Sequence, residues 1–247
     1  MKLTQWGQLL FHSFGYHVER VGISQKFPII KPMDKNGVEI LADKEFRDSC
    51  KAVIHRTLLD TPRLANLWML CRMTDAEGAM VEIGSYKGGG ALHLSNCCPK
   101  RKIMVFDPFD RASFEHISPS MDNIFRKGQF SDSSEDDVAR LLQGRNKFIC
   151  RGYFPSSVRG TSLPTISFVH LDVDVYAATK DSLTYLLTEA KLAARTLIVL
   201  DDYNRGAAGV NTAVEEILCE IKGTLAFPLF PGQALIIPKS WYSSNVI

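Results

Sequence analysis

The sequence lacks any apolar run long enough to span a bilayer, so no membrane partner is expected. The first residues, MKLTQWGQLLFHSFGYHVER, contain neither an uninterrupted apolar stretch nor a small-residue cleavage site, and a secretory signal is therefore not predicted. An excess of one charge is also lacking, because 29 Lys and Arg face 27 Asp and Glu for a net charge of +2. Without a basic stripe interleaved with aromatic residues, nucleic acid is not an expected partner.

Paired cysteine spacings are absent as well. The six cysteines are scattered along the chain, which favours reduced thiols in a cytoplasmic protein over a disulfide framework. Cys97 and Cys98 are adjacent and form no C-x-x-C pair. The spacing therefore does not predict a structural zinc site.

What the sequence does have is the composition of a folded chain with a core: 247 residues, 45% hydrophobic and 23% charged. Its character changes near Gly78. Before that point, Thr61 followed by Pro62 is a cap-then-proline helix start, and apolar residues then recur at helical spacing. We expect residues 1–75 to form a helical appendage, with a lid and a homo-oligomer contact as its two candidate roles. Residues 76–247 are expected to form the main domain.

Beyond Gly78, short apolar runs alternate with helical patterns. The runs occupy 79–84, 102–107, 147–151, 165–172 and 196–202, and two more, TLAFPLF and QALIIP, follow near the end. Continuous apolar strands separated by helices predict a parallel sheet covered on both faces. The last two runs are separated only by a Pro/Gly turn and predict an antiparallel hairpin at the sheet edge. The fold expected is α/β, with a doubly wound, mostly parallel, seven-stranded sheet.

Polar residues end the predicted strands, where a doubly wound sheet binds its ligands. The first strand ends in Glu82-Ile-Gly-Ser-Tyr-Lys-Gly-Gly-Gly, a glycine-rich turn that lets a ligand approach backbone N–H groups. Tyr86 stands where a nicotinamide fingerprint needs glycine, and Glu82 suits a ligand with a positive amino group. Asp107 ends the second strand, 23 residues after Gly84, and can accept hydrogen bonds from ribose hydroxyls. Together these features favour S-adenosylmethionine as the cofactor.

Four aspartates follow the next two strands of the predicted sheet. Asp172 and Asp174 follow residues 166–171, and Asp201 and Asp202 follow residues 197–200. Carboxylates crowded at one sheet edge repel one another unless a positive group lies among them. A hard cation with oxygen ligands fits this need, Mg²⁺ first and Mn²⁺ or Ca²⁺ as alternatives.

Three other residues near the strand ends carry weaker expectations. His170 lies within an apolar strand and is expected to be a core histidine bonded to backbone. Tyr153 and Phe154 follow the third strand and are candidates for contact with the adenine or the acceptor.

The order of these segments resembles the macrocin O-methyltransferase family, metal-dependent enzymes that methylate sugar hydroxyls. The matching segments are Glu82-Ile-Gly-Ser-Tyr-Lys-Gly-Gly, Phe106-Asp-Pro-Phe, Arg151-Gly-Tyr-Phe-Pro, Leu171-Asp-Val-Asp-Val-Tyr-Ala-Ala-Thr and Val199-Leu-Asp-Asp-Tyr. They cover about residues 75 to 240, and the segment from Asp172 together with Asp-Asp-Tyr is the most specific part. The family usually has Gly-Gly before the fifth strand, where this chain has Ala194-Arg195, and the turn at 108–111 is also unusual. These differences weaken any transfer of the acceptor's identity.

The resemblance implies a Rossmann-like methyltransferase sheet and assigns roles within it. Asp172, Asp201 and Asp202 would be the metal ligands, and Asp174 the general base beside Asp172. The cofactor would lie against Glu82, Gly84, Ser85, Tyr86, Gly88, Asp107, Pro108 and Phe109. The acceptor implied is a small-molecule glycoside or saccharide, and the reaction a methyl transfer from S-adenosylmethionine to a metal-bound hydroxyl.

Three rival interpretations remain open. A catechol or phenolic O-methyltransferase also uses a metal and strand-end carboxylates. A glycosyltransferase is suggested by Asp172-Val-Asp174, which imitates the Asp-x-Asp metal motif but leaves Glu82 and Asp201-Asp202 unexplained. A non-catalytic cofactor-binding module would not need four aspartates around one point.

Overall fold

A computed structural model describes residues 16–19, 29–32, 40–109 and 117–243. The strands are β1 (Tyr16–Glu19), β2 (Ile29–Pro32), β3 (Ala79–Ile83), β4 (Ile103–Asp107), β5 (Lys147–Arg151), β6 (Ile166–Leu171), β7 (Leu192–Leu200), β8 (Leu225–Leu229) and β9 (Gln233–Ile237). The helices are α3 (Lys44–Val53), α4 (Thr61–Arg72), α5 (Gly89–Cys97), α6 (Glu135–Leu141), the short η1 (Ser156–Val158), α7 (Tyr176–Thr188), α8 (Ala208–Glu220) and α9 (Ser240–Ser243).

The strands form one sheet in the order β1-β2-β8-β9-β7-β6-β3-β4-β5. The pairs within β5-β4-β3-β6-β7 are all parallel, and β9 runs antiparallel to both β7 and β8. The seven strands β3 to β9 and the closing hairpin confirm the predicted α/β sheet. The hairpin is not the outer edge, however, because β2 pairs with β8 and β1 pairs with β2. An edge strand leaves backbone groups unpaired, and here a segment from the N-terminal part of the chain pairs with them.

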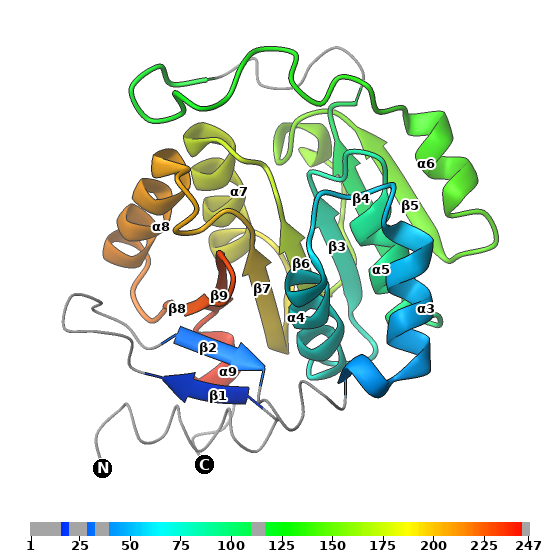
Figure 1. Ribbon diagram of the computed structural model, residues 1–247. Coiled ribbons are helices and arrows are strands. Elements are labelled where there is room, and N and C mark those ends of the chain that lie inside the picture. The colour runs from blue at the N-terminus through cyan, green and yellow to red at the C-terminus, as the bar shows by residue number, and fades with distance from the viewer. Residues whose placement is uncertain (1–15, 20–28, 33–39, 110–116, 244–247) are drawn as a thin grey trace.

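Helices cover both faces of the sheet (Figure 1). On one face, α3, α4 and α5 pack over alternate residues of the central strands, among them Met80, Val105 and Phe168. On the other face, α7 and α8 pack over the intervening residues, such as Val81 and Val169. Every residue of β3, β4 and β6 is buried, which explains why these strands are uninterrupted apolar runs.

The residues before 75 contribute the expected helices and also two strands that the sequence did not predict. Helix α4 begins at Thr61, but its cap is Asp60, whose side chain accepts a hydrogen bond of 3.0 Å from the backbone N–H of Arg63. Phe46 of α3 and Trp68 of α4 pack edge-on, with ring centroids 5.7 Å apart, in the same core as the sheet residues. The division of the chain at residue 75 remains a prediction.

Within the described part of the chain, no helix has the length and apolar character needed to cross a membrane.

Candidate active site

The carboxyl ends of four parallel strands meet at one edge of the sheet. The register pairs Ile83 of β3 with Phe106 of β4 on one side and with Leu171 of β6 on the other, and Leu171 pairs with Leu200 of β7. After β3 the chain forms β4 and β5 on one side of that strand and then crosses to form β6 on its other side. The reversal of strand order at β3 makes a topological switch point. A cavity of about 360 Å³ lies there.

The first half of the cavity is built around the buried carboxylate of Glu82, the fourth residue of β3. The Ser85 hydroxyl donates to its Oε2 at 2.5 Å, and His170 Nδ1 lies 3.1 Å from its Oε1. A Cβ atom at Gly90, in the first turn of α5, would overlap Oε1. Glycine at that position therefore lets the helix start closely approach the carboxylate.

The glycine-rich turn after β3 is held by Asp107, at the end of β4. The backbone N–H groups of Ser85 and Tyr86 donate to Asp107 Oδ2 at 2.6 and 2.9 Å, and the N–H of Phe109 donates to Oδ1 at 2.6 Å. Burial raises the pKa of Asp107, and the three backbone donors oppose that rise. Gly84 has a φ of +81°, and a Cβ there would overlap the carbonyl oxygen of Asp172.

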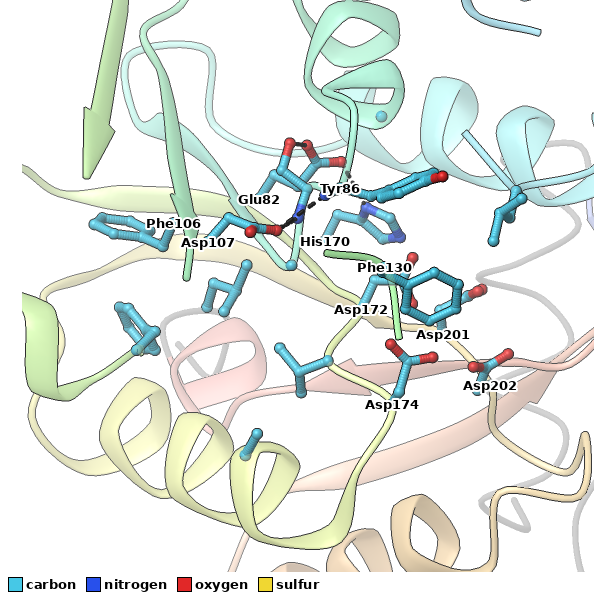
Figure 2. Close-up of a pocket in the computed structure, with 18 of the residues that line it drawn as sticks. Glu82, Tyr86, Phe106, Asp107, Phe130, His170, Asp172, Asp174, Asp201 and Asp202 are labelled. Atoms are coloured by element: carbon cyan, nitrogen blue, oxygen red, sulfur yellow. Dashed lines mark hydrogen bonds and ion pairs between the residues drawn. The ribbon is translucent and has the colours of Figure 1, made fainter. Parts of the chain in front are cut away.

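The second half of the cavity holds the four aspartates (Figure 2). Asp172, Asp174 and Asp202 each offer a carboxylate oxygen, and these oxygens lie within 4.8 Å of one another. Asp174 and Asp202 have positive φ angles of 65° and 58°, so both occupy a backbone region that non-glycine residues rarely adopt. Strain of this kind is concentrated at functional sites, where the surrounding structure enforces it.

Burial and mutual repulsion raise the pKa values of three of these aspartates. Burial, followed by the charges of the neighbouring aspartates, raises the pKa of Asp172 well above its usual value. Burial and a hydrogen bond with Asp202 do the same to the pKa of Asp174. The pKa of Asp201 is raised by burial and held back by Arg63.

Arg63, on α4, is a site residue that the sequence did not reveal. Its guanidinium is buried and donates through Nη1 to Asp201 Oδ2 and through Nη2 to the carbonyl oxygen of Leu58 at 2.6 Å. The same Nη1 lies 4.0 Å from Asp202 Oδ1. The other oxygen of Asp201, Oδ1, is buried without a hydrogen-bond partner among the described residues.

Two of the residues expected at the cofactor do not line the cavity. Phe109 is buried in the hydrophobic core and does not line the cavity, although its backbone N–H holds Asp107. Gly88 also lies outside the lining, and a Cβ there would press on the side chains of Val138 and Leu141 of α6. The requirement for glycine at 88 therefore comes from helix packing and from its φ of +81°. Pro108 does line the cavity, as do Gly84, Ser85 and Tyr86.

The three weaker expectations have mixed outcomes. His170 is buried, but it bonds to the Glu82 carboxylate rather than to backbone, and it lines the cavity. Its Nε2 atom is buried without a partner in the described structure. Tyr153 and Phe154 both line the cavity, and the contacts proposed for them with adenine or acceptor remain predictions.

Other lining residues come from segments with no recognisable motif. Thr57, Leu58 and Leu59 precede α4, while Phe125 and Phe130 lie between β4 and α6. The Tyr86 ring packs edge-on against Phe130 with centroids 5.5 Å apart. The glycine turn and the β4–α6 segment thus enclose the cavity together.

A doubly wound sheet that carries these acidic residues at its switch point is consistent with an S-adenosylmethionine-dependent methyltransferase. The chain belongs to the macrocin O-methyltransferase family, whose sequence profile, described as Macrocin-O-methyltransferase (TylF), matches residues 49–221. This match confirms the family that the strand-end motifs predicted. A comparison with curated protein sequences found no match.

Solved structures show the same fold. The O-methyltransferase NovP is 19% identical with a TM-score of 0.64, and the alignment covers 74% of this chain and 82% of NovP. CalS11, a calicheamicin methyltransferase, is 16% identical with a TM-score of 0.60, over 88% of this chain and 98% of CalS11. The methyltransferase PaMTH1 of Podospora anserina, solved with bound SAH, is 13% identical with a TM-score of 0.55, over 87% and 98% of the two chains.

Proposed function

We propose that this protein transfers the methyl group of S-adenosylmethionine to a hydroxyl of a sugar-containing small molecule, with Mg²⁺ at the aspartates. The observation that carries this proposal is the single cavity, which joins a buried carboxylate and glycine turn on one side to four aspartates on the other. The family assignment supports O-methylation. CalS11, similar in fold, is described as a TDP-rhamnose 3'-O-methyltransferase, which supports a sugar as the acceptor.

The cofactor half fits the chemistry of S-adenosylmethionine. Glu82 is a buried carboxylate that lines the cavity, and a buried charge requires a partner of opposite sign, which the amino group of the cofactor would supply. Asp107 already accepts three backbone donors and would use its remaining lone pairs for the ribose hydroxyls. Phe106, Phe125 and Phe154 give the lining an apolar portion suited to adenine.

The acidic half fits a hard divalent cation. All four residues offer carboxylate oxygens, which Mg²⁺ prefers, and the pKa values of Asp172 and Asp174, raised first by burial and then by neighbouring aspartates, support a cation there. We assign Asp172, Asp201 and Asp202 as ligands. Asp172 and Asp202 belong to the group of closely spaced carboxylates, whereas Asp201 lies outside that group, is paired with Arg63, and is assigned from the family resemblance. When bound, the cation would lower the pKa of a sugar hydroxyl and fix its position.

Asp174 is assigned as the general base. It lies two residues from Asp172 in the same cluster, held at a positive φ by the turn between β6 and α7. As the hydroxyl oxygen bonds to the methyl carbon, the carbon–sulfur bond breaks and its electron pair remains on sulfur. Asp174 accepts the hydroxyl proton in that step.

The test is a methyl-transfer assay with the full chain, S-adenosylmethionine and either Mg²⁺ or chelator. Sugar nucleotides and glycosides form one acceptor panel and catechols a second. Mg²⁺-dependent release of S-adenosylhomocysteine with a sugar acceptor is expected. Turnover only with catechols would move the protein to the phenolic class. Failure of S-adenosylhomocysteine to bind in a calorimetric titration would overturn the cofactor assignment itself.

A further inference from the structure

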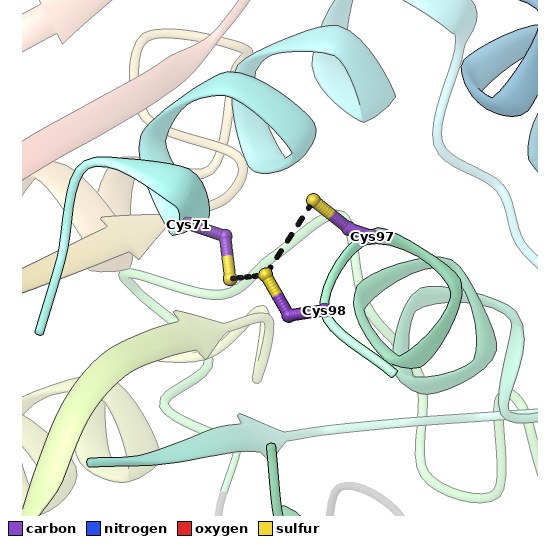
Figure 3. A group of neighbouring side chains, drawn as sticks. All are labelled: Cys71, Cys97 and Cys98. Carbon is purple, nitrogen blue, oxygen red and sulfur yellow. Dashed lines mark hydrogen bonds between the residues drawn. The ribbon is translucent and has the colours of Figure 1, made fainter. Parts of the chain in front are cut away.

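Three cysteines from two helices meet in the core, away from the cavity that holds the aspartates. Cys71 lies near the end of α4, Cys97 is the last residue of α5, and Cys98 caps that helix. We call Cys71, Cys97 and Cys98 the thiol cluster (Figure 3). Each can offer its sulfur to one point, because the three Sγ atoms lie within 4.8 Å of one another. None of the three lines the cavity.

Two of the three sulfur separations in the thiol cluster match those of a metal–thiolate centre. Cys98 Sγ lies 3.7 Å from Cys71 Sγ and 3.8 Å from Cys97 Sγ. In a tetrahedral centre with Zn–S bonds of about 2.3 Å, neighbouring sulfurs are about 3.8 Å apart. A fourth soft atom is close by, because Met80 Sδ lies 3.3 Å from Cys71 Sγ. Sulfur ligands of this kind select soft ions such as Zn²⁺ and Cu⁺ over Mg²⁺.

A buried cation stands beside the thiol cluster. Arg101 is only 8% exposed and lies 3.5 Å from Cys71 Sγ through Nη1. Its other acceptors are neutral: the carbonyl oxygens of Gly78 and Cys71 and the hydroxyls of Thr74 and Ser167. Among the described residues no ion pair joins this guanidinium to a carboxylate, although Asp75 lies near enough for the Arg101 charge to contribute to lowering the pKa of its carboxyl. A buried charge without a contacting counterion is costly, so negative charge on the cluster would be stabilising here.

We propose that the thiol cluster is a binding site for a soft metal ion, with Zn²⁺ as the first probe. Each coordinating cysteine binds as the thiolate and gives its proton to solvent. Zn²⁺ with three thiolates carries one net negative charge, which the Arg101 guanidinium neutralises. Cys98 is partly exposed and provides the route of entry, while Cys71 and Cys97 are buried.

The position of the cluster gives this site a structural role. Helix α4 carries Arg63 in its first turn and Cys71 eight residues later, about 12 Å along the axis. Helix α5 begins at the glycine turn with Gly89 and ends at Cys97, an equal distance away. A metal at the thiol cluster therefore joins the far ends of two helices whose near ends build the cavity.

The experiment titrates Zn²⁺, and then Co²⁺, into the reduced full chain with Mg²⁺ in excess to occupy carboxylates. One equivalent of Zn²⁺ per chain is expected, together with a sulfur-to-cobalt charge-transfer band. In Cys98→Ser, Zn²⁺ affinity falls about 100-fold or more and the band disappears. Cys219→Ser, at an exposed cysteine outside the cluster, behaves as the parent does.

Stability gives a second measurement that does not depend on enzyme activity. At Zn²⁺ concentrations about 100-fold above Kd, Tm rises by about 5–10 °C in the parent and in Cys219→Ser. The rise is absent in Cys98→Ser and in Cys97→Ser, which serves as the second variant if the first folds poorly. Absence of metal uptake by the reduced parent overturns the proposal. The proposal is also overturned if Cys98→Ser and Cys97→Ser take up metal as the parent does and no sulfur-to-cobalt charge-transfer band appears.

Discussion

Arg63 and Asp201 form a buried ion pair between residues 138 positions apart in the chain. Arg63 lies in the first turn of α4 and Asp201 directly follows β7, so the pair joins the N-terminal helices to the acidic half of the cavity. Both side chains are almost fully excluded from solvent. Only one oxygen of Asp201 bonds to Arg63, and the other is buried without a hydrogen-bond partner among the described residues.

Replacing Arg63 with alanine leaves the Asp201 carboxylate buried and without its cation. Loss of one partner of a buried pair typically costs about 3 kcal/mol or more in the free energy of unfolding. We expect that loss in chelator, and a smaller loss with saturating Mg²⁺, because the bound ion restores positive charge. Urea denaturation under both conditions measures the difference. Lys51→Ala, at an exposed position on α3, should change the free energy of unfolding little. An equal loss with and without Mg²⁺ would argue against a cation beside Asp201.

The roles of Asp201 and Asp174 can be separated by their asparagine variants. Asp201→Asn should weaken Mg²⁺ binding about 10-fold or more, since it removes a charged ligand. Asp174→Asn should keep Mg²⁺ affinity within about threefold while kcat falls by about 10²–10⁴, the usual contribution of a general base. Calorimetry measures the first quantity and steady-state kinetics the second, with the exposed Asp181→Asn as control. The reverse pattern would place Asp174, which clusters with Asp172 and Asp202, among the ligands.

His93 should make stability depend on pH. It is fully buried on α5, with Nδ1 2.9 Å from Ser49 Oγ and Nε2 3.0 Å from the carbonyl oxygen of Leu64. Burial lowers the pKa of His93 from 6.5 to about 4. Below pH 6.5 the unfolded chain therefore takes up a proton that the folded chain refuses, and the free energy of unfolding falls as the pH drops toward 4. The loss is about 2 kcal/mol by about pH 5.

The measurement compares urea denaturation of the parent and of His93→Gln at about pH 7.5 and about pH 5. The free energy of unfolding of the parent minus that of His93→Gln should be smaller by that amount at the lower pH. Carboxylates that titrate in both proteins contribute equally to each and cancel from this difference. His55→Gln, at an exposed position, should follow the parent. Identical pH profiles for the parent and His93→Gln would rule out burial of a neutral imidazole.

The central sheet could be predicted because its strands have a strong local signal. Strands β3, β4 and β6 are buried on both faces and therefore read as apolar runs, and each ends in an acidic or glycine-rich turn. Strands β1 and β2 have four residues each, too few for a periodic pattern. They are strands because β8 offers an edge to pair with, and that edge exists only in the folded protein.

The acidic residues of the site were predictable for the same reason, since parallel strands bring their ends to one edge. Arg63 was not, because one arginine in a helical pattern is ordinarily a solvated residue and its partner lies on a distant strand. The thiol cluster was missed because Cys71 and Cys97 have no paired spacing in sequence. Packing of α4 against α5 brings them together.

Asp107 accepts three backbone N–H groups, two from the turn after β3 and one from its own loop. That half of the cavity is therefore already in one conformation before any ligand arrives, and the conformational entropy of the turn is lost during folding rather than during binding. The proposed cofactor would therefore bind to a turn that is already ordered, so we expect substitutions at Asp107 to slow cofactor association without altering the strands that hold the turn.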